Sequence, residues 1–313
     1  MIMSLCIGNI NISIIEIINV FSNENNTFRK IILDIRLPRL LNAFLVGISL
    51  SVSGLILQTF LRNNLAETGI LGISAGAGLG AIIVFILTTS ISISFLNLIS
   101  FTFAFSTTLL IFFIAKGLNR KYETYFSVNK IILSGIAINA LLSAVNALLL
   151  IVAGNDLTQI IYWMNGGLNG RGWEEFKNVI VFVIIGLTIS LLILKNLKII
   201  NIGDEIASSL GINLKVTQIL AVIACSLLAS SAVAVAGIIS FIGLIIPNII
   251  RLILGSDLKF NFAGAVLLGP VFMIISDLIA RTVISPSELP VGIVTAFIGA
   301  PVFVWLILKS KNI

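Results

Sequence analysis

The stretch TGILGISAGAGLGAIIVFILTTSISISFLNLISFTFAFSTTLLIFFIA, residues 68–115, contains no charged side chain. A helix needs about 20 apolar residues to cross the hydrocarbon core of a bilayer, so this stretch is long enough for two crossings. In lipid the backbone polar groups must pair internally, which leaves helices or closed barrels as spanning structures. Because the stretch lacks the apolar–polar alternation of barrel strands, it predicts membrane-spanning helices.

The same apolar character extends over the rest of the chain. Its 313 residues are 58% hydrophobic and 10% charged, whereas soluble domains carry about 25% charged residues. Further uncharged runs occupy Ile180–Leu194 and Ile219–Ile239. We therefore predict an all-α polytopic membrane protein, a single transmembrane domain over residues 1–313 with about nine to ten transmembrane helices. The spans that the sequence defines are about 37–60, 69–89, 92–116, 128–153, 176–195, 215–237, 238–254, 261–281 and 292–309.

Lysine and arginine positions predict the orientation, since these residues favour cytoplasmic loops. With the C-terminus inside, seven of them lie outside: Arg29, Lys30, Arg36, Arg39, Arg171, Lys177 and Arg281. Twelve lie inside: Arg62, Lys116, Arg120, Lys121, Lys130, Lys195, Lys198, Lys215, Arg251, Lys259, Lys309 and Lys311. The formal net charge of +6 therefore reflects topology, and it does not indicate a nucleic-acid partner.

Three outer arginines run against this bias at the mouths of two spans, namely Arg36, Arg39 and Arg281. One interpretation is that they anchor the helices by reaching toward lipid headgroups. The other is that they form a cationic ring that docks an acidic extracytoplasmic partner. Asp277 stands four residues before Arg281, and this spacing predicts an ion pair between them.

Several kinds of chemistry are excluded or disfavoured by composition. Histidine is absent, which removes the commonest metal ligand and the usual general base. Cys6 and Cys225 are far apart and match no disulfide or thiolate metal motif. No Walker A pattern occurs, so ATP hydrolysis by that route would need another subunit. We expect no catalytic residue, metal site or cofactor in this chain.

Two segments are predicted to lie outside the spans. Residues 1–30 form a short N-terminal segment, in which Ile2–Phe21 is interrupted by Glu16 and is expected to be interfacial or partly buried. Residues 155–172 contain four glycines after Asn165 and predict an exposed loop. Pro38 suits the first turn of a helix, whereas Pro247 and Pro301 should kink or break theirs.

Small and weakly polar residues recur at helical spacing along three predicted spans. Such stripes allow helix backbones to approach closely, so packing is the first interpretation of two of them: Gly47, Ser51, Gly54, Gln58, and Gly72, Gly76, Gly80. The third stripe is Gly135, Asn139, Ser143 and Asn146. Its polar side chains could line a wide translocation path or form interhelical hydrogen bonds, and the sequence leaves both open.

Four groups of motifs occur in a characteristic order. They are RLPR (36–39) with LVG (45–47), SGLILQ (53–58), RNNLAETG (62–69) and LGISAGA (71–77); GDEIASSLG (203–211); GIISFIGLIIPNIIR (237–251); and ELPVGIVTAFIGAP (288–301). Together they resemble the iron-complex and cobalamin permeases of ABC importers, the FecCD or BtuC-like family. The resemblance covers nearly everything from Arg36 onward.

This resemblance implies a type II ABC importer fold and a set of partners. They are a second permease subunit, as a homodimer or paralogous heterodimer, two ABC ATPase subunits that use the ATP, an extracytoplasmic substrate-binding protein and membrane lipid. It assigns binding-protein docking to Arg36, Arg39 and Arg281. It also assigns ATPase coupling to residues within a cytoplasmic segment, 196–214: Gly203, Asp204, Glu205, Ala207, Leu210 and Gly211.

The chain departs from the family pattern in three places. Asn64 and Asn248 stand where the family usually has Pro and His. The family's first transmembrane helix has no counterpart before Ile7–Phe21, and we expect either a shortened chain or a start placed too late.

We expect a permease of the bacterial cytoplasmic membrane that imports a ferric siderophore or related iron chelate by alternating access and is not itself an enzyme. Cobalamin and haem are the alternative substrates. An ion-coupled secondary transporter is the rival class, for which Asp277 would be the nearest intramembrane ionisable group.

Overall fold

A computed structural model describes residues 2–8, 10, 12–22, 28–87, 93–116 and 128–309. Arg120, Lys121 and Lys311, three of the charges used for the orientation, lie outside these ranges. Every regular element in the described part is helical. The elements are α1 Ile2–Cys6, α2 Ile14–Ser22, the π-helix η1 Ile31–Arg36, α3 Leu37–Leu61, the 3₁₀ turn η2 Thr68–Leu71, α4 Ile73–Leu87, α5 Ile93–Lys116, α6 Val128–Val152, the 3₁₀ turn η3 Gly154–Asp156, α7 Leu157–Met164, α8 Trp173–Ile200, α9 Asp204–Ser209, α10 Leu214–Ala236, α11 Ile242–Leu254, α12 Leu258–Thr282 and α13 Val291–Lys309.

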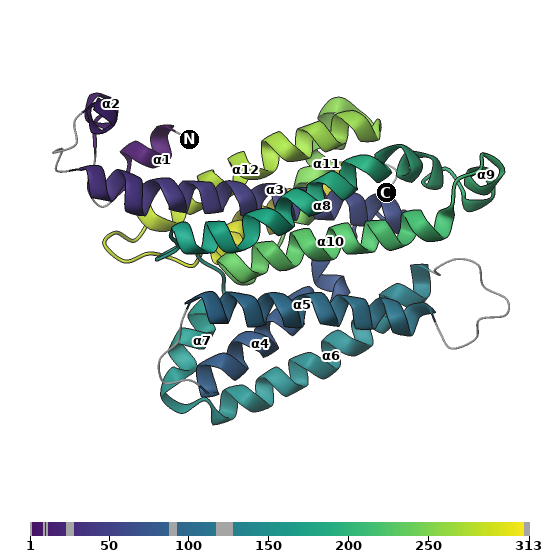
Figure 1. Cartoon of the computed structure of the whole chain (residues 1–313), viewed down its shortest axis with the longest axis horizontal. Coiled ribbons are helices and arrows are strands. Elements are labelled where there is room, and N and C mark those ends of the chain that lie inside the picture. The colour runs from purple at the N-terminus through teal and green to yellow at the C-terminus, as the bar shows by residue number, and fades with distance from the viewer. Residues whose placement is uncertain are drawn as a thin grey trace.

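The predicted spans correspond to the long apolar helices. Six helices are long and apolar enough to cross a membrane, and α4, α11 and α13 are shorter apolar helices. They run roughly side by side along the long axis of the molecule (Figure 1). The short helices α1 and α2 lie at one end of this axis, and α9 lies at the other (Figure 1). The prediction of an all-α polytopic membrane protein is confirmed.

Helix α3 is the centre of the bundle. It packs against α8, α10, α11 and α12, while α4, α5 and α6 form a second group that contacts the first mainly at α10 and also, from α5, at α8 (Figure 1). The small-residue stripe of α3 makes these contacts close. A Cβ at Gly54 would stand 2.0 Å from the carbonyl oxygen of Gly243 on α11. The hydroxyl of Ser51 donates to the carbonyl of Ala265 on α12 at 2.8 Å. The packing interpretation of this stripe is confirmed.

Pro247 lies inside α11 without ending the helix. A proline removes the hydrogen bond to the carbonyl four residues earlier, which here belongs to Gly243. Nε2 of Gln58 on α3 donates to that carbonyl at 3.1 Å. The side chain of a neighbouring helix therefore satisfies the group that the proline frees, as membrane helices require.

Two expectations about boundaries were wrong. Residues 155–172 are not an exposed loop throughout, because they contain α7, and Ile160, Trp163 and Leu168 are buried. The glycine-rich signal applies only to the part after α7. The span predicted at 238–254 begins later, at Ile242, since Gly237 and Phe241 both have positive φ angles and interrupt the helix between α10 and α11.

Candidate functional site

The three arginines predicted for docking lie at the end of the molecule that carries α1. Arg36 is the last residue of η1, Arg39 is in the first turn of α3, and Arg281 is in the last turn of α12. The side chains of Arg39 and Arg281 gather with Asp277 and Glu288, and Arg36 lies close enough to Arg281 to repel it electrostatically. We call these five residues the outer arginine cluster, after the side of the membrane that the sequence predicts for them. Each arginine is less than 9% exposed. Three guanidinium groups face two carboxylates, which leaves a net positive charge.

Arg39 is the best-paired member of the cluster. Its Nε lies 3.1 Å from each carboxylate oxygen of Asp277, and its Nη2 lies 2.8 Å from Oδ1. Its Nη1 contacts Glu288 at 3.0–3.1 Å. The predicted Asp277–Arg281 pair is present but longer, at 3.9 Å. Sequence spacing located the local pair and missed Arg39 and Glu288, which are far from Asp277 along the chain.

Arg36 and Arg281 are covered by the N-terminal segment. Arg36 donates to the main-chain carbonyls of Leu5, Cys6 and Ile10. Nη2 of Arg281 donates to the carbonyl and hydroxyl oxygens of Ser4, at 2.6 and 2.7 Å. The prediction of a partly buried N-terminal segment is thereby explained: α1 lies on two arginines. The partners that the N-terminal segment supplies are neutral oxygens, whereas a carboxylate would form stronger, charge-assisted bonds.

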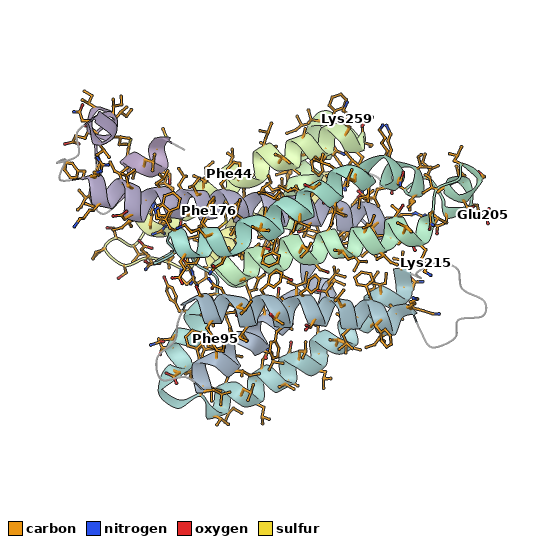
Figure 2. All side chains as sticks on the ribbon, in the orientation of Figure 1. Phe44, Phe95, Phe176, Glu205, Lys215 and Lys259 are labelled. Atoms are coloured by element: carbon orange, nitrogen blue, oxygen red, sulfur yellow. The ribbon has the colours of Figure 1, made fainter. Side chains whose placement is uncertain are left out.

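The predicted coupling segment forms a short helix, α9, at the opposite end. Ala207 is buried and fixes α9 to the ends of α8 and α10 through Ile200 and Leu214. Glu205 points away from the bundle in Figure 2, where Lys215 and Lys259 also lie in the half of the molecule distant from α1. Leu210 is 64% exposed, and the apolar side chains of Ile202 and Ile206 are exposed beside it. Gly203 precedes α9, and Gly211 follows it with a positive φ.

Polar contacts tie α9 to the long helices. Asp204, in the first turn of α9, forms an ion pair with Arg62 at the end of α3. Arg62 also donates to the carbonyl of Ile200, the last residue of α8, at 2.6 and 3.0 Å. A second pair joins Lys198 to Asp257 at 2.8 Å and connects α8 with the start of α12. A displacement of α9 would therefore act directly on α3 and α8.

The polar stripe of α6 mostly faces protein. Nδ2 of Asn139 donates to the carbonyl of Gly69 at 2.9 Å, and Nδ2 of Asn146 donates to that of Ala75 at 3.1 Å. A Cβ at Gly135 would stand 2.2 Å from the carbonyl of Ile70. These contacts hold α6 against η2 and α4, which favours the interhelical alternative for Gly135, Asn139 and Asn146. Ser143 is the one exposed member of the stripe.

Glu67 was not singled out from the sequence, although it lies inside one of the quoted motifs. Its Oε1 accepts a hydrogen bond of 2.6 Å from the backbone N–H of Phe241, at the break before α11. Burial raises the pKa of Glu67, and this hydrogen bond acts against the shift. Within the described ranges, no group of three or more metal-ligating acidic or cysteine side chains occurs.

Sequence relatives with named functions cover most of the chain. The hemin transport permease HmuU of Yersinia pestis is 35% identical, over 93% of this chain and 87% of its own length. The Fe(3+) dicitrate permease FecD of Escherichia coli is 34% identical, over 90% and 86%. The vitamin B12 import permease BtuC of Citrobacter koseri is 36% identical, over 89% and 83%.

A solved structure and a family model agree with these relatives. The structure is described as an inward-facing conformation of a metal-chelate type ABC transporter, and it matches with a TM-score of 0.87 and 28% identity. The match covers 99% of this chain and 95% of the solved one. The model of the FecCD transport family matches residues 1–309. With the helical bundle, the outer arginine cluster and the exposed helix α9 in place, the chain belongs to the FecCD transport family of ABC permeases.

Proposed function

We propose that this chain is the permease subunit of an ATP-driven importer that carries an iron chelate, first of all a ferric siderophore, across the bacterial cytoplasmic membrane. The observation that carries the proposal is the set of relatives, whose named substrates are hemin, ferric dicitrate and vitamin B12. All three are chelated metals. Haem and cobalamin are therefore supported equally and are the alternatives to test alongside the siderophore.

Substrate identity is tested by uptake in cells. Cells with and without the gene, with the neighbouring ATPase intact, are given labelled ferric siderophore, haem or cobalamin. The proposal expects uptake of one chelate to fall in the deletion strain and to return with the wild-type gene. If only haem uptake or only cobalamin uptake is lost, that chelate replaces the siderophore as the assigned substrate. If no chelate is affected, the iron-chelate importer is rejected.

The proposed mechanism is alternating access driven by two partner ATPases. Exposed apolar side chains on α9 suit a protein cleft, because Leu210 and Ile206 lie on a short helix outside the long apolar spans. ATP binding favours one state of the ATPases, and this differential affinity supplies the energy of the change. Movement of α9 would be transmitted to α3 and α8 through Arg62. No bond of the substrate is made or broken by the permease.

On the outer side, the proposed partner is a binding protein with acidic docking residues. The net positive outer arginine cluster supports this choice of charge. Arg36 and Arg281 are covered by α1, so docking at these two residues would require α1 to move and carboxylates to replace its carbonyl oxygens.

The docking proposal is tested with Arg36→Gln and with Lys177→Gln as the matched control. Lys177 is an exposed cation near the start of α8, and it makes no contact with the outer arginine cluster. Affinity for the binding protein is measured at low and high salt. We expect Arg36→Gln to weaken binding and to make it less sensitive to salt, since salt screens the attraction between charges on two docking surfaces. Equal effects of both variants would show a general charge effect and contradict docking at the cluster.

A further inference from the structure

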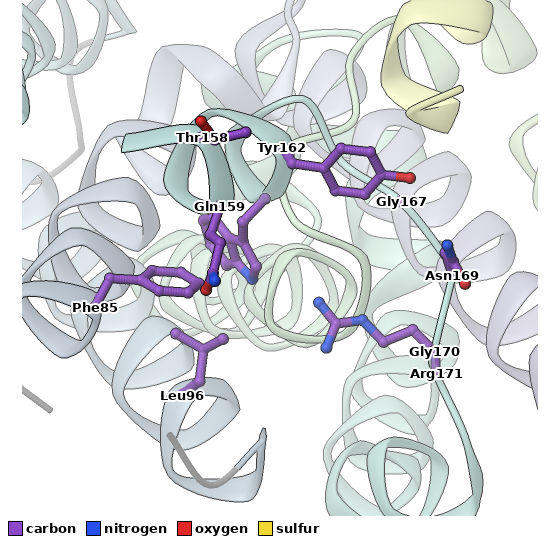
Figure 3. A pocket seen from close by; sticks show the side chains of 10 residues that line it. Phe85, Leu96, Thr158, Gln159, Tyr162, Gly167, Asn169, Gly170 and Arg171 are labelled. Atoms are coloured by element: carbon purple, nitrogen blue, oxygen red, sulfur yellow. The ribbon is translucent and has the colours of Figure 1, made fainter. Parts of the chain in front are cut away.

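A cavity of about 490 Å³ lies between α4, α5 and α7, and it borders the outer arginine cluster, since the hydroxyl of Tyr162 at its edge donates to the carbonyl of Glu288 at 3.5 Å. Phe85 of α4 and Leu96 of α5 form its apolar wall, and Tyr162 and Trp163 contribute from α7. Gly170 and Arg171 close it from the segment that follows α7. Figure 3 shows the guanidinium of Arg171 pointing across the pocket toward Gln159 and Leu96.

The guanidinium of Arg171 makes no hydrogen bond within the described residues. Its Nε is buried without a partner and is closed off from the cavity, as is Nε1 of Trp163. The Nη groups stand at the tip of the side chain that points across the pocket (Figure 3). Native proteins seldom leave a largely buried guanidinium without an acceptor, so these Nη groups are the donors that a ligand in the cavity would meet.

The nearest acid does not supply that acceptor. Oε1 of Glu175 lies 3.7 Å from Nη1 of Arg171, beyond hydrogen-bonding distance, and is itself without a hydrogen bond. Oε2 of Glu175 is used by the backbone N–H of Gly172 at 2.7 Å. Glu175 therefore balances the charge of Arg171 while leaving its Nη groups without a hydrogen bond.

We propose that this cavity binds a carboxylate or phosphate group attached to an apolar body. The acidic oxygens would accept hydrogen bonds from the Nη groups of Arg171, and the apolar part would pack on Phe85, Leu96 and the ring of Trp163. Bonds from a guanidinium to a carboxylate or phosphate are charge-assisted and are the strong ones in proteins. The ligand has two chemical sources, an anionic phospholipid or a small carboxylic acid. The proposal concerns this site alone and does not depend on the transported chelate.

The test uses the full chain purified in a neutral maltoside detergent. Dihexanoyl phosphatidylglycerol represents the phosphate source and decanoate the carboxylate source, with methyl decanoate as the uncharged control. Binding is followed by tryptophan fluorescence and, independently, by the shift in thermal unfolding temperature. We expect saturable binding of at least one anionic probe and none of the methyl ester. Tighter binding of the phospholipid or of decanoate identifies the source.

Variants show whether the binding occurs in this cavity. Because Arg171→Gln alone leaves Glu175 without its counter-charge, the main variant is the double substitution Arg171→Gln, Glu175→Gln. We expect it to weaken binding by about tenfold or more. Lys177→Gln is the control and should bind as wild type.

Three results would overturn the proposal: no saturable binding of either anion, equal binding of the methyl ester, or unchanged binding by the double variant. Cellular uptake of the chelate is a separate measurement. Failure of the cavity proposal would therefore leave the transport proposal standing. Failure of the transport proposal would likewise leave the cavity proposal standing.

Discussion

Replacing Arg39 by Met should destabilise the folded chain more than any other single change in the outer arginine cluster. The guanidinium makes three hydrogen bonds of 2.8–3.1 Å to Asp277 and further contacts to Glu288. The Asp277 side chain is only 2% exposed, so it would be left as a buried charge with Arg281 at 3.9 Å as its nearest cation. Breaking a buried pair by removing one partner costs about 3–5 kcal/mol. That is a factor of roughly 10² to 10³·⁵ in the unfolding equilibrium constant.

The same reasoning predicts that a second substitution recovers most of the loss. With Arg39→Met and Asp277→Leu together, neither charge remains unpaired, and apolar replacement of a buried pair is often neutral. Asp277→Leu alone should cost less than Arg39→Met, because Arg39 keeps Glu288. Lys177→Met, an exposed substitution at the same end, should stay within about 0.5 kcal/mol of wild type.

The assay is equilibrium unfolding in mixed maltoside–dodecyl sulfate micelles, followed by circular dichroism, on the four proteins of this double-mutant cycle and the control. A coupling energy above about 0.5 kcal/mol between the two sites supports the reasoning. If the double variant loses as much stability as the sum of the single variants, Arg39 and Asp277 act independently, and the account of the cluster is refuted.

Three further predictions follow from the packing, the buried carboxyl group and α9. Gly54→Ala should destabilise by about 1–3 kcal/mol because its Cβ meets the carbonyl of α11 at 2.0 Å, whereas Gly69→Ala, with nothing within 4 Å, should be nearly neutral in the same unfolding assay. Burial raises the pKa of Glu67 above its ordinary value of 4.5. The wild type should therefore lose stability relative to Glu67→Gln as pH rises through that raised pKa. A stability difference between the two proteins that stays constant with pH would contradict this. Leu210→Asp should abolish co-purification of the ATPase, and Val283→Asp, equally exposed at 64% but on α12 at the other end, should not; loss with both variants would argue against α9 as the contact.

Within the described residues, the apolar runs predicted the six long helices and the three shorter apolar ones well, because bilayer thickness and the cost of charge in lipid act on local sequence alone. The interruption before α11 was missed for a different reason. It depends on Gly237, where an added Cβ would stand 2.2 Å from the carbonyl of Trp163. It also depends on Glu67, which accepts a hydrogen bond from the N–H of Phe241. Both are contacts between distant parts of the chain, and no local pattern contains them.

The candidate sites also combine features that local sequence predicts with features that depend on contacts between distant parts of the chain. Helical spacing placed Asn139 and Asn146 on one face correctly, but periodicity does not say whether that face meets another helix or a path. The bias of positive charge drew attention to Arg36 and Arg281, and the structure adds that α1 covers them. The coupling residues of α9 were assigned from the resemblance to the family. The placement of α9 at the end opposite α1 agrees with that assignment, and its contact with an ATPase stays a prediction.

The central claim is that this permease works with an ATPase, and reconstitution tests it most directly. The chain and its ATPase subunit are inserted into liposomes, supplied with the loaded binding protein, and assayed for chelate accumulation with ATP and with an ionophore that collapses ion gradients. We predict accumulation that requires ATP and is unaffected by the ionophore. Accumulation that proceeds without ATP and stops when the gradient collapses would contradict the account and identify an ion-coupled transporter.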